Sequence, residues 1–176
     1  MRLIRFTIGA ILVCVGAPMH AQQRAANKAD SARRVVQTFY DWYVPRAANP
    51  RGRDMIMAAA THGPVRLGPE LSHWLRIDST ARARSKDEVN GLDGDPYLNA
   101  QDPCKEYTAQ PSTAVPGGTF MVPVLGRGGC APHETPDVFV ELAHRPGGWM
   151  ILEFRDPNRK NEGTIPLLKR LHPKAR

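Results

Sequence analysis

The sequence contains no apolar run long enough to cross a bilayer. Its apolar stretch near the start, residues 6–15, falls well short of the ~20 residues that a membrane helix requires. Two arginines precede this stretch and the small residues 17–21 follow it, which is the three-part pattern of a secretory signal. We therefore expect a signal peptide at residues 1–21, cleaved after Ala21. The mature protein would be periplasmic or secreted and would have no transmembrane segment.

Cysteine is also scarce, with three in the chain. Cys14 follows Val13, where a lipoprotein signal requires Gly or Ala, so we do not expect lipid anchoring at Cys14. Cys104 and Cys130 remain after cleavage, and an even pair in an oxidising compartment favours a disulfide bridge. Two alternatives stay open, a metal site with His133 and a redox pair, although neither has the close Cys-x-x-Cys spacing that such sites prefer.

The compact motifs of several enzyme classes are absent. There is no His-Glu-x-x-His zinc motif, no serine in a glycine-flanked elbow, and no phosphate-binding glycine loop with its lysine and hydroxyl. The chain contains 6 histidines, and no two have the i, i+4 placement of a zinc helix. The motifs therefore identify no catalytic residue, no metal site and no cofactor.

Acidic residues are fewer than basic ones, 17 against 24, which gives a formal net charge of +7. The basic residues fall in short clusters separated by acids and apolar residues. A nucleic-acid-binding protein more often shows one basic face with interleaved aromatics. We therefore expect no nucleic acid partner. After export, the partner would be an envelope protein or a small ligand.

A change of periodicity divides the chain in the middle. Apolar residues recur at helical spacing first, and from Cys104 onward they alternate as in strands. We expect helices at residues 31–44, at 55–60, from Pro69 onward, and at 165–171. We expect strands at residues 105–109, 119–125, 138–143 and 149–154. The aromatic stripe of the first helix, Phe39, Tyr40 and Tyr43, is interpreted as core, and Pro123 would place its strand at an edge or a bulge.

These elements predict a single α+β domain. Its N-terminal helices would pack on one face of a curved, mainly antiparallel four-stranded sheet, with a short C-terminal helix. The domain would span residues 31–172, after a flexible N-terminal tail at 22–30 and before a basic tail at 173–176. A concave sheet under helices is a common place for a ligand cavity.

Residues 94–104, between the two halves, concentrate acids, amides and an aromatic around two prolines. We select Asp95, Tyr97, Asn99, Gln101 and Asp102 as candidate ligand or partner contacts. The two aspartates would serve as general acid and base, with the tyrosine as proton donor, if their environments separated their pKa values. The simpler interpretation, which we favour, is that the aspartates cap the short helix and the turn that follows.

Four segments carry a family resemblance: residues 35–42 (VVQTFYDW), 65–75 (VRLGPELSHWL), 95–97 (DPY) and 148–155 (GWMILEFR). Together they resemble a bacterial domain-of-unknown-function family of envelope proteins that includes the YbjP-like lipoproteins. The resemblance implies a cystatin-like or nuclear-transport-factor-like (NTF2-like) fold and an envelope location. It implies no catalytic residue, and this chain departs from the family because it lacks the lipid-attachment signal.

Three functions follow as hypotheses. The first, which we favour, is a noncatalytic envelope binding or accessory module that uses residues 94–104 and the loop around Cys130. The second is a small-pocket hydrolase or isomerase with Asp95 or Asp102 as base and Tyr97 as donor. The third is an inhibitor or immunity-type protein that blocks a secreted enzyme with its loop at 126–136.

Overall fold

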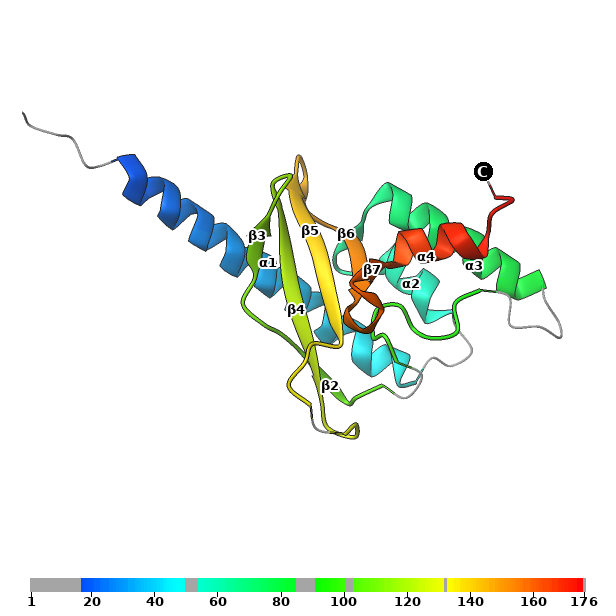
Figure 1. The fold of residues 1–176 in the computed structure, drawn as a ribbon. Coiled ribbons are helices and arrows are strands. Elements are labelled where there is room, and N and C mark those ends of the chain that lie inside the picture. The colour runs from blue at the N-terminus through cyan, green and yellow to red at the C-terminus, as the bar shows by residue number, and fades with distance from the viewer. Residues whose placement is uncertain (1–16, 50–53, 85–90, 101–102, 132, 176) are drawn as a thin grey trace, which may run out of the picture.

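The structure, a computed structural model, describes residues 17–49, 54–84, 91–100, 103–131 and 133–175. In these parts the chain forms four α-helices and a seven-stranded sheet (Figure 1). The helices are α1 (Ala17–Ala47), α2 (Met55–His62), α3 (Pro69–Arg84) and α4 (Thr164–Leu171). The strands are β1 (Arg66–Leu67), β2 (Glu106–Ala109), β3 (Thr113–Val115), β4 (Thr119–Arg127), β5 (Val138–Arg145), β6 (Gly148–Asp156) and β7 (Glu162–Gly163). Most of the predicted signal peptide, residues 1–16, lies outside the described residues, as does Cys14.

The sheet has the order β1-β6-β5-β4-β2, with β3 also paired to β4 and β7 to β6. β1 runs parallel to β6, and the other pairings are antiparallel. The predicted α+β class and curved sheet are confirmed, but the prediction of four strands is wrong, because the sheet is mixed and has seven. The predicted strands correspond to β2, β4, β5 and β6. The missed ones, β1, β3 and β7, have two or three residues, too few for an alternating pattern to show.

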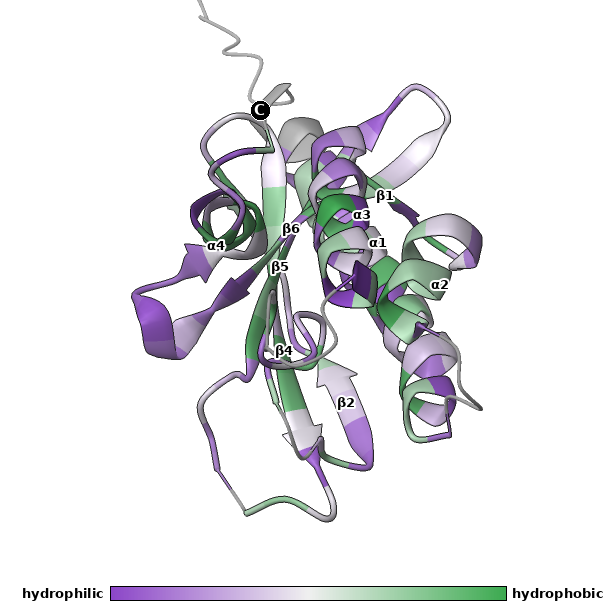
Figure 2. Cartoon of the chain, turned by 90° about the vertical axis from the view of Figure 1, so that its right-hand side faces the viewer, coloured by the Kyte–Doolittle hydropathy of each residue, from purple (hydrophilic) through white to green (hydrophobic). Residues whose placement is uncertain are grey.

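The helices cover both sides of the sheet. α1, α2 and α3 lie on one side, and α4 lies on the other side beside β6 (Figure 1 and Figure 2). Among the described residues, no helix combines the length and the hydrophobicity that a bilayer span requires.

α1 is longer than the sequence predicts. It begins at Ala17 instead of residue 31, and it includes residues 22–30, which the sequence predicts as a flexible tail. These residues are rich in Ala, Gln, Lys and Arg, which have high helix propensity. Residues 22–28 are exposed, and this end of α1 extends past the sheet (Figure 1). Propensity, instead of core packing, therefore accounts for the helix here.

The core lies between α1 and the sheet and contains a cluster of aromatic side chains. The Phe39 ring centroid lies 5.5 Å from that of Tyr43, 5.4 Å from that of Tyr97 and 5.6 Å from that of Phe154. Phe39, Tyr40 and Tyr43 are all buried. The interpretation of this stripe as core is confirmed.

Pro123 lies in an interior strand, so the predicted edge position is wrong, but the predicted irregularity is present. Between the pairs Ala109–Val124 and Thr113–Met121, three residues face two of β4. β4 pairs with β5 on one side and with β2 and β3 on the other. The Pro123 carbonyl accepts a bond from Gln110 N at 2.8 Å, between the ends of β2 and β3. The N and C=O of a strand residue point to the same side, so the N–H that Pro123 lacks would also point toward residues 110–112. These residues lie between β2 and β3, where no strand pairing requires that donor.

Candidate functional site

Asp95 caps the residues that follow it, as the sequence predicts, but residues 96–99 form a turn and not the predicted short helix. Its Oδ1 accepts bonds from the backbone N–H of Tyr97 at 2.9 Å and of Leu98 at 3.3 Å, and its Oδ2 accepts one from the Tyr43 hydroxyl at 2.6 Å. Burial raises the pKa of the Asp95 carboxyl, and these hydrogen bonds and the charge of Arg82 oppose that rise. Both oxygens are bound within the protein, which favours a structural role.

Tyr97 and Asn99 join layers of the fold. The buried Tyr97 hydroxyl donates to the Ile56 carbonyl at 2.9 Å, and burial raises its pKa. The Asn99 amide donates to Asp137 O at 3.1 Å and to Asp156 Oδ1 at 2.9 Å. Asn99 has φ of 49°, a left-handed conformation that asparagine tolerates better than most residues.

The predicted contacts do not all meet in one place. Asp95 and Asn99 both line a cavity of about 270 Å³, which Tyr97 does not line. Gln101 and Asp102 lie outside the described residues. The side chains of Asp95, Tyr97 and Asn99 are held by internal hydrogen bonds. They connect parts of the fold and do not form a free contact surface.

The Cys104 and Cys130 sulfurs lie at bonding distance, 2.05 Å, as a disulfide. The expected pairing is therefore confirmed.

The residues around the bridge are closely fitted to it. A Cβ on Gly126 would lie 2.5 Å from Cys104 Sγ, so the bridge requires glycine there. Asp137 fixes the far end of the loop, since its Oδ2 accepts a bond from Gly126 N at 2.6 Å and lies 2.9 Å from His133 Nε2. His133 is thus bound by a carboxylate, and no metal-binding group of three His, Cys, Asp or Glu occurs among the described residues.

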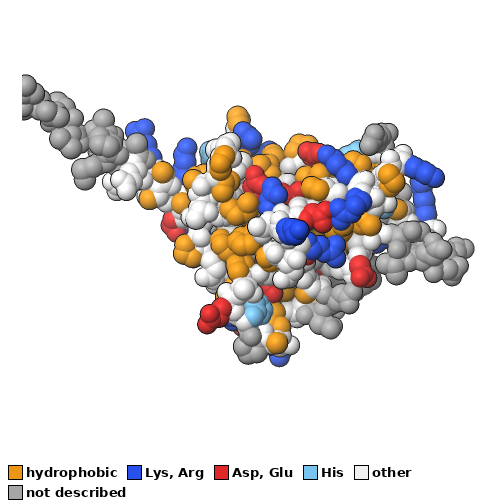
Figure 3. Space-filling model, viewed as in Figure 1, with side chains coloured by type: hydrophobic (Ala, Val, Ile, Leu, Met, Phe, Trp, Pro, Cys, Tyr) orange, Lys and Arg blue, Asp and Glu red, His pale blue; other side chains and the backbone are white. Residues whose placement is uncertain are grey.

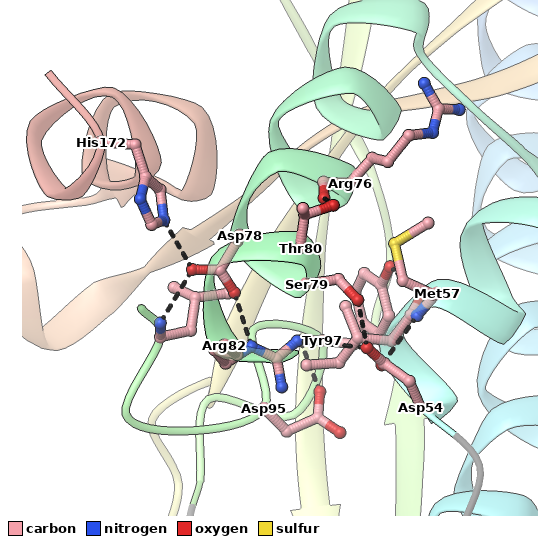
Figure 4. Close-up of polar contacts among 12 residues, drawn as sticks. Asp54, Met57, Arg76, Asp78, Ser79, Thr80, Arg82, Asp95, Tyr97 and His172 are labelled. Carbon is pink, nitrogen blue, oxygen red and sulfur yellow. Dashed lines mark hydrogen bonds and ion pairs between the residues drawn. The ribbon is translucent and has the colours of Figure 1, made fainter. Parts of the chain in front are cut away.

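A polar network on α3 connects the helices to the C-terminal segment (Figure 4). Asp78, fully buried, accepts bonds from Arg82 Nε at 2.9 Å and from the Leu92 backbone N–H at 3.1 Å. Its Oδ1 also lies 2.9 Å from His172 Nε2. A buried carboxylate is tolerated only when it is paired and hydrogen-bonded, and three partners meet that requirement here.

Arg82 carries the network to α2. Its Nη2 lies 3.4 Å from Asp54 Oδ2, which also accepts a bond from the Ser79 hydroxyl at 2.7 Å. Asp54 Oδ1 caps α2 by accepting from Met57 N at 3.1 Å. α2, α3 and the C-terminal segment are therefore held together by ionic and polar contacts.

A groove of about 800 Å³ lies between α3 and the residues that follow α4. The α3 side chains that line it recur every three or four residues, which places them on one helix face. At ~1.5 Å per residue that face is about 16 Å long. The groove residues are His73, Arg76, Ile77, Thr80, Ala81 and Arg84 of α3, and Leu171, His172, Pro173, Lys174 and Ala175.

The groove combines an apolar floor with a basic rim. Ile77 packs against the core, and Leu171 is 40% exposed, the most exposed large hydrophobic side chain among the described residues. Arg76, Arg84 and Lys174 are exposed, and none forms an ion pair with a residue that the structure describes. Among the described residues, no Asp or Glu lines the groove. Figure 3 shows Lys and Arg side chains, interspersed with Asp and Glu, over the half of the molecule that carries α3 and α4.

The network positions one wall of this groove. His172 lines the groove and also contacts Asp78, which lies on the buried face of α3. The contact therefore ties the C-terminal segment to α3 and sets the distance between the two walls.

Glu153 on β6 is a second buried acid. Its Oε1 accepts bonds from Phe154 N at 3.0 Å and from Ile165 N at 3.2 Å. The residue before α4, Gly163, has no capping side chain, so Glu153 caps α4 from the neighbouring strand. Burial raises the pKa of Glu153 to about 7, and the backbone hydrogen bonds oppose that rise.

We expect this cap to make stability depend on pH. Because the folded-state pKa exceeds the value of 4.5 for a free glutamate, the native state binds more protons, and stability falls as pH rises from about 4.5 to 7. At ~1.36 kcal/mol per pKa unit the loss is at most about 3.5 kcal/mol. E153Q should lack this decrease. In urea unfolding, its free energy of unfolding should therefore fall less between pH 4.5 and pH 8 than that of wild type.

Glu162 provides a control of opposite sign. Its hydrogen bond with Arg170 lowers its pKa, so its contribution to stability is present above the ordinary glutamate pKa and is lost in acid. E162Q should therefore lose stability at neutral pH. A difference between E153Q and wild type that stayed constant from pH 4.5 to 8 would contradict the role assigned to Glu153.

The sequence analysis missed Asp54, Asp78, Arg82, Glu153 and His172. Asp78 had a detectable signal, because it follows apolar α3 residues at the i+3, i+4 and i+7 positions of the buried face. An acid at such a position requires a buried partner. His172 had none, because its contact with Asp78 joins residues 94 apart in the chain.

Comparison with family models, with curated proteins and with solved structures found no match to this chain.

Proposed function

We propose that the chain is an exported, noncatalytic binding module of NTF2-like or cystatin-like fold that holds a small ligand in the α3 groove. The observation that carries the proposal is the groove itself, an apolar floor under basic side chains, with no acidic side chain among its described lining residues. Its volume of about 800 Å³ lies within the ~300 to 1,000 Å³ typical of small-molecule sites. A secretory pattern at residues 1–21 and the Cys104–Cys130 disulfide support the exported location.

The proposal favours binding over catalysis because the candidate acids already have partners. Asp95, Asp78 and Asp54 each accept two or three internal hydrogen bonds. A general base must reach a substrate proton directly or through one water. The residues that the structure describes in the groove lining include no carboxylate side chain for that step.

The groove is tested with 1-anilinonaphthalene-8-sulfonate, a fluorescent probe that is both apolar and anionic. We expect the folded protein to bind it with enhanced fluorescence, and A81W, which fills the groove, to reduce the affinity at least about tenfold. A83W is the matched control, because Ala83 lies on the same helix but lines another cavity beside Tyr43. Circular dichroism should show both variants folded.

Two results would oppose the proposal. Equal loss of probe binding in A81W and A83W would place the probe outside the groove. Turnover of chromogenic acyl or phosphoryl esters by the pure protein, abolished by D95N but not by A81W, would favour an enzyme built on residues 94–104.

A further inference from the structure

We infer that the groove takes a single-chain anionic lipid, such as a fatty acid, with its acyl chain along the floor and its head group at the basic rim. The inference rests on the proposed function and assigns the class of ligand. It is argued from the shape, the hydrogen-bonding capacity and the charge of the groove.

The shape fits an extended chain. The groove follows one face of α3 from His73 to Arg84, about 16 Å at ~1.5 Å per residue, between helical and C-terminal walls. Ile77 and Ala81 form its helical floor, and Leu171 and Ala175 face them from the other wall. An apolar groove of this length suits a linear hydrocarbon better than a compact polar molecule.

The hydrogen-bonding groups of the groove suit a peptide ligand less well than an acyl chain. The α3 backbone is bonded within its helix, and the Thr80 hydroxyl already donates to Arg76 O at 2.8 Å. Peptide N–H groups laid against this helical wall would find few free acceptors and would lose their bonds to water, at a cost for each unpaired group. An acyl chain has no such groups to satisfy.

The charge selects the head group. Arg76 lies on the α3 wall and Lys174 on the C-terminal wall, and neither forms an ion pair with a described residue. An anionic head group at the rim would be attracted to these charges and would form a charge-assisted hydrogen bond with the one it reaches. A bilayer surface fits less well, because apolar side chains that insert into a membrane project from the surface, whereas Ile77 and Ala81 lie on the groove floor.

The test is titration calorimetry of the folded mature protein with octanoate, decanoate and dodecanoate below their micellar concentrations. Each added methylene should raise affinity about fourfold until the groove is filled. Dodecyltrimethylammonium, with the same chain and the opposite charge, should bind at least about tenfold more weakly than dodecanoate. R76Q and K174Q should each weaken dodecanoate binding severalfold and leave binding of neutral dodecyl maltoside unchanged.

K160Q is the matched control, since Lys160 is exposed but lies outside the groove, and it should bind dodecanoate as wild type does. The inference is overturned if affinity does not depend on chain length, if the cationic detergent binds equally well, or if only phosphatidylglycerol vesicles bind. If none of these ligands binds while the sulfonate probe still binds and A81W weakens its binding, the groove is a binding site and only the assigned ligand class is wrong. If the probe also fails, the proposed function falls with it.

Discussion

Replacement of Asp78 by alanine is expected to lower the free energy of unfolding by about 3 to 5 kcal/mol. The side chain is fully buried, so its removal leaves Arg82, His172 and the Leu92 N–H without their shared acceptor. Removing one member of a buried ionic network is costly because water replaces the lost partner only in part, although Arg82 keeps its contact with Asp54. Urea denaturation followed by circular dichroism measures the loss.

Asp30 supplies the control for burial. It also contacts two arginines, Arg33 and Arg34, but its side chain is 50% exposed. D30A should therefore change stability by less than about 1 kcal/mol. A loss in D78A no larger than that in D30A would show that the Asp78 network does not hold the fold together.

Loss of the Cys104–Cys130 disulfide is expected to cost about 3.5 kcal/mol. The bridge closes a sequence separation of 26 residues, and the chain-entropy relation gives that magnitude for a loop of this length. The C104A/C130A variant measures it in a urea titration. Wild type treated with dithiothreitol should fall to a similar stability.

The reductant provides the internal check. Dithiothreitol should leave C104A/C130A unchanged, because that variant has no bridge to break. Mass analysis of the native wild-type protein should show two fewer hydrogens than its reduced form. Two alkylatable thiols in the native protein, or a reductant without effect on wild-type stability, would rule out a stabilising bridge.

The sequence predicted the elements that bury a regular apolar pattern. The alternation in β4, β5 and β6 and the aromatic stripe of α1 were visible because each spans several residues of one periodicity. The short strands were not predictable, since a pairing such as Arg66 with Met150 depends on tertiary position and leaves no local pattern.

The site was harder to predict than the fold. The acids of residues 94–104 attracted attention because they are crowded in sequence, yet Asp95 and Asn99 serve to join the layers. The groove arises where α3 meets the C-terminal segment. Neither half is unusual in sequence, so only their juxtaposition in the fold reveals the basic rim.

The parallel pairing of β1 with β6 has a consequence for how the protein is made. β6 fills the slot between β1 and β5, so a nascent chain that ends before residue 148 leaves β5 with an open edge and β1 without its neighbour. Contacts between such distant segments form late, because loop closure must precede them. Cooperative folding therefore waits for the C-terminal third, and the ribosome must release almost the whole chain before the sheet is complete.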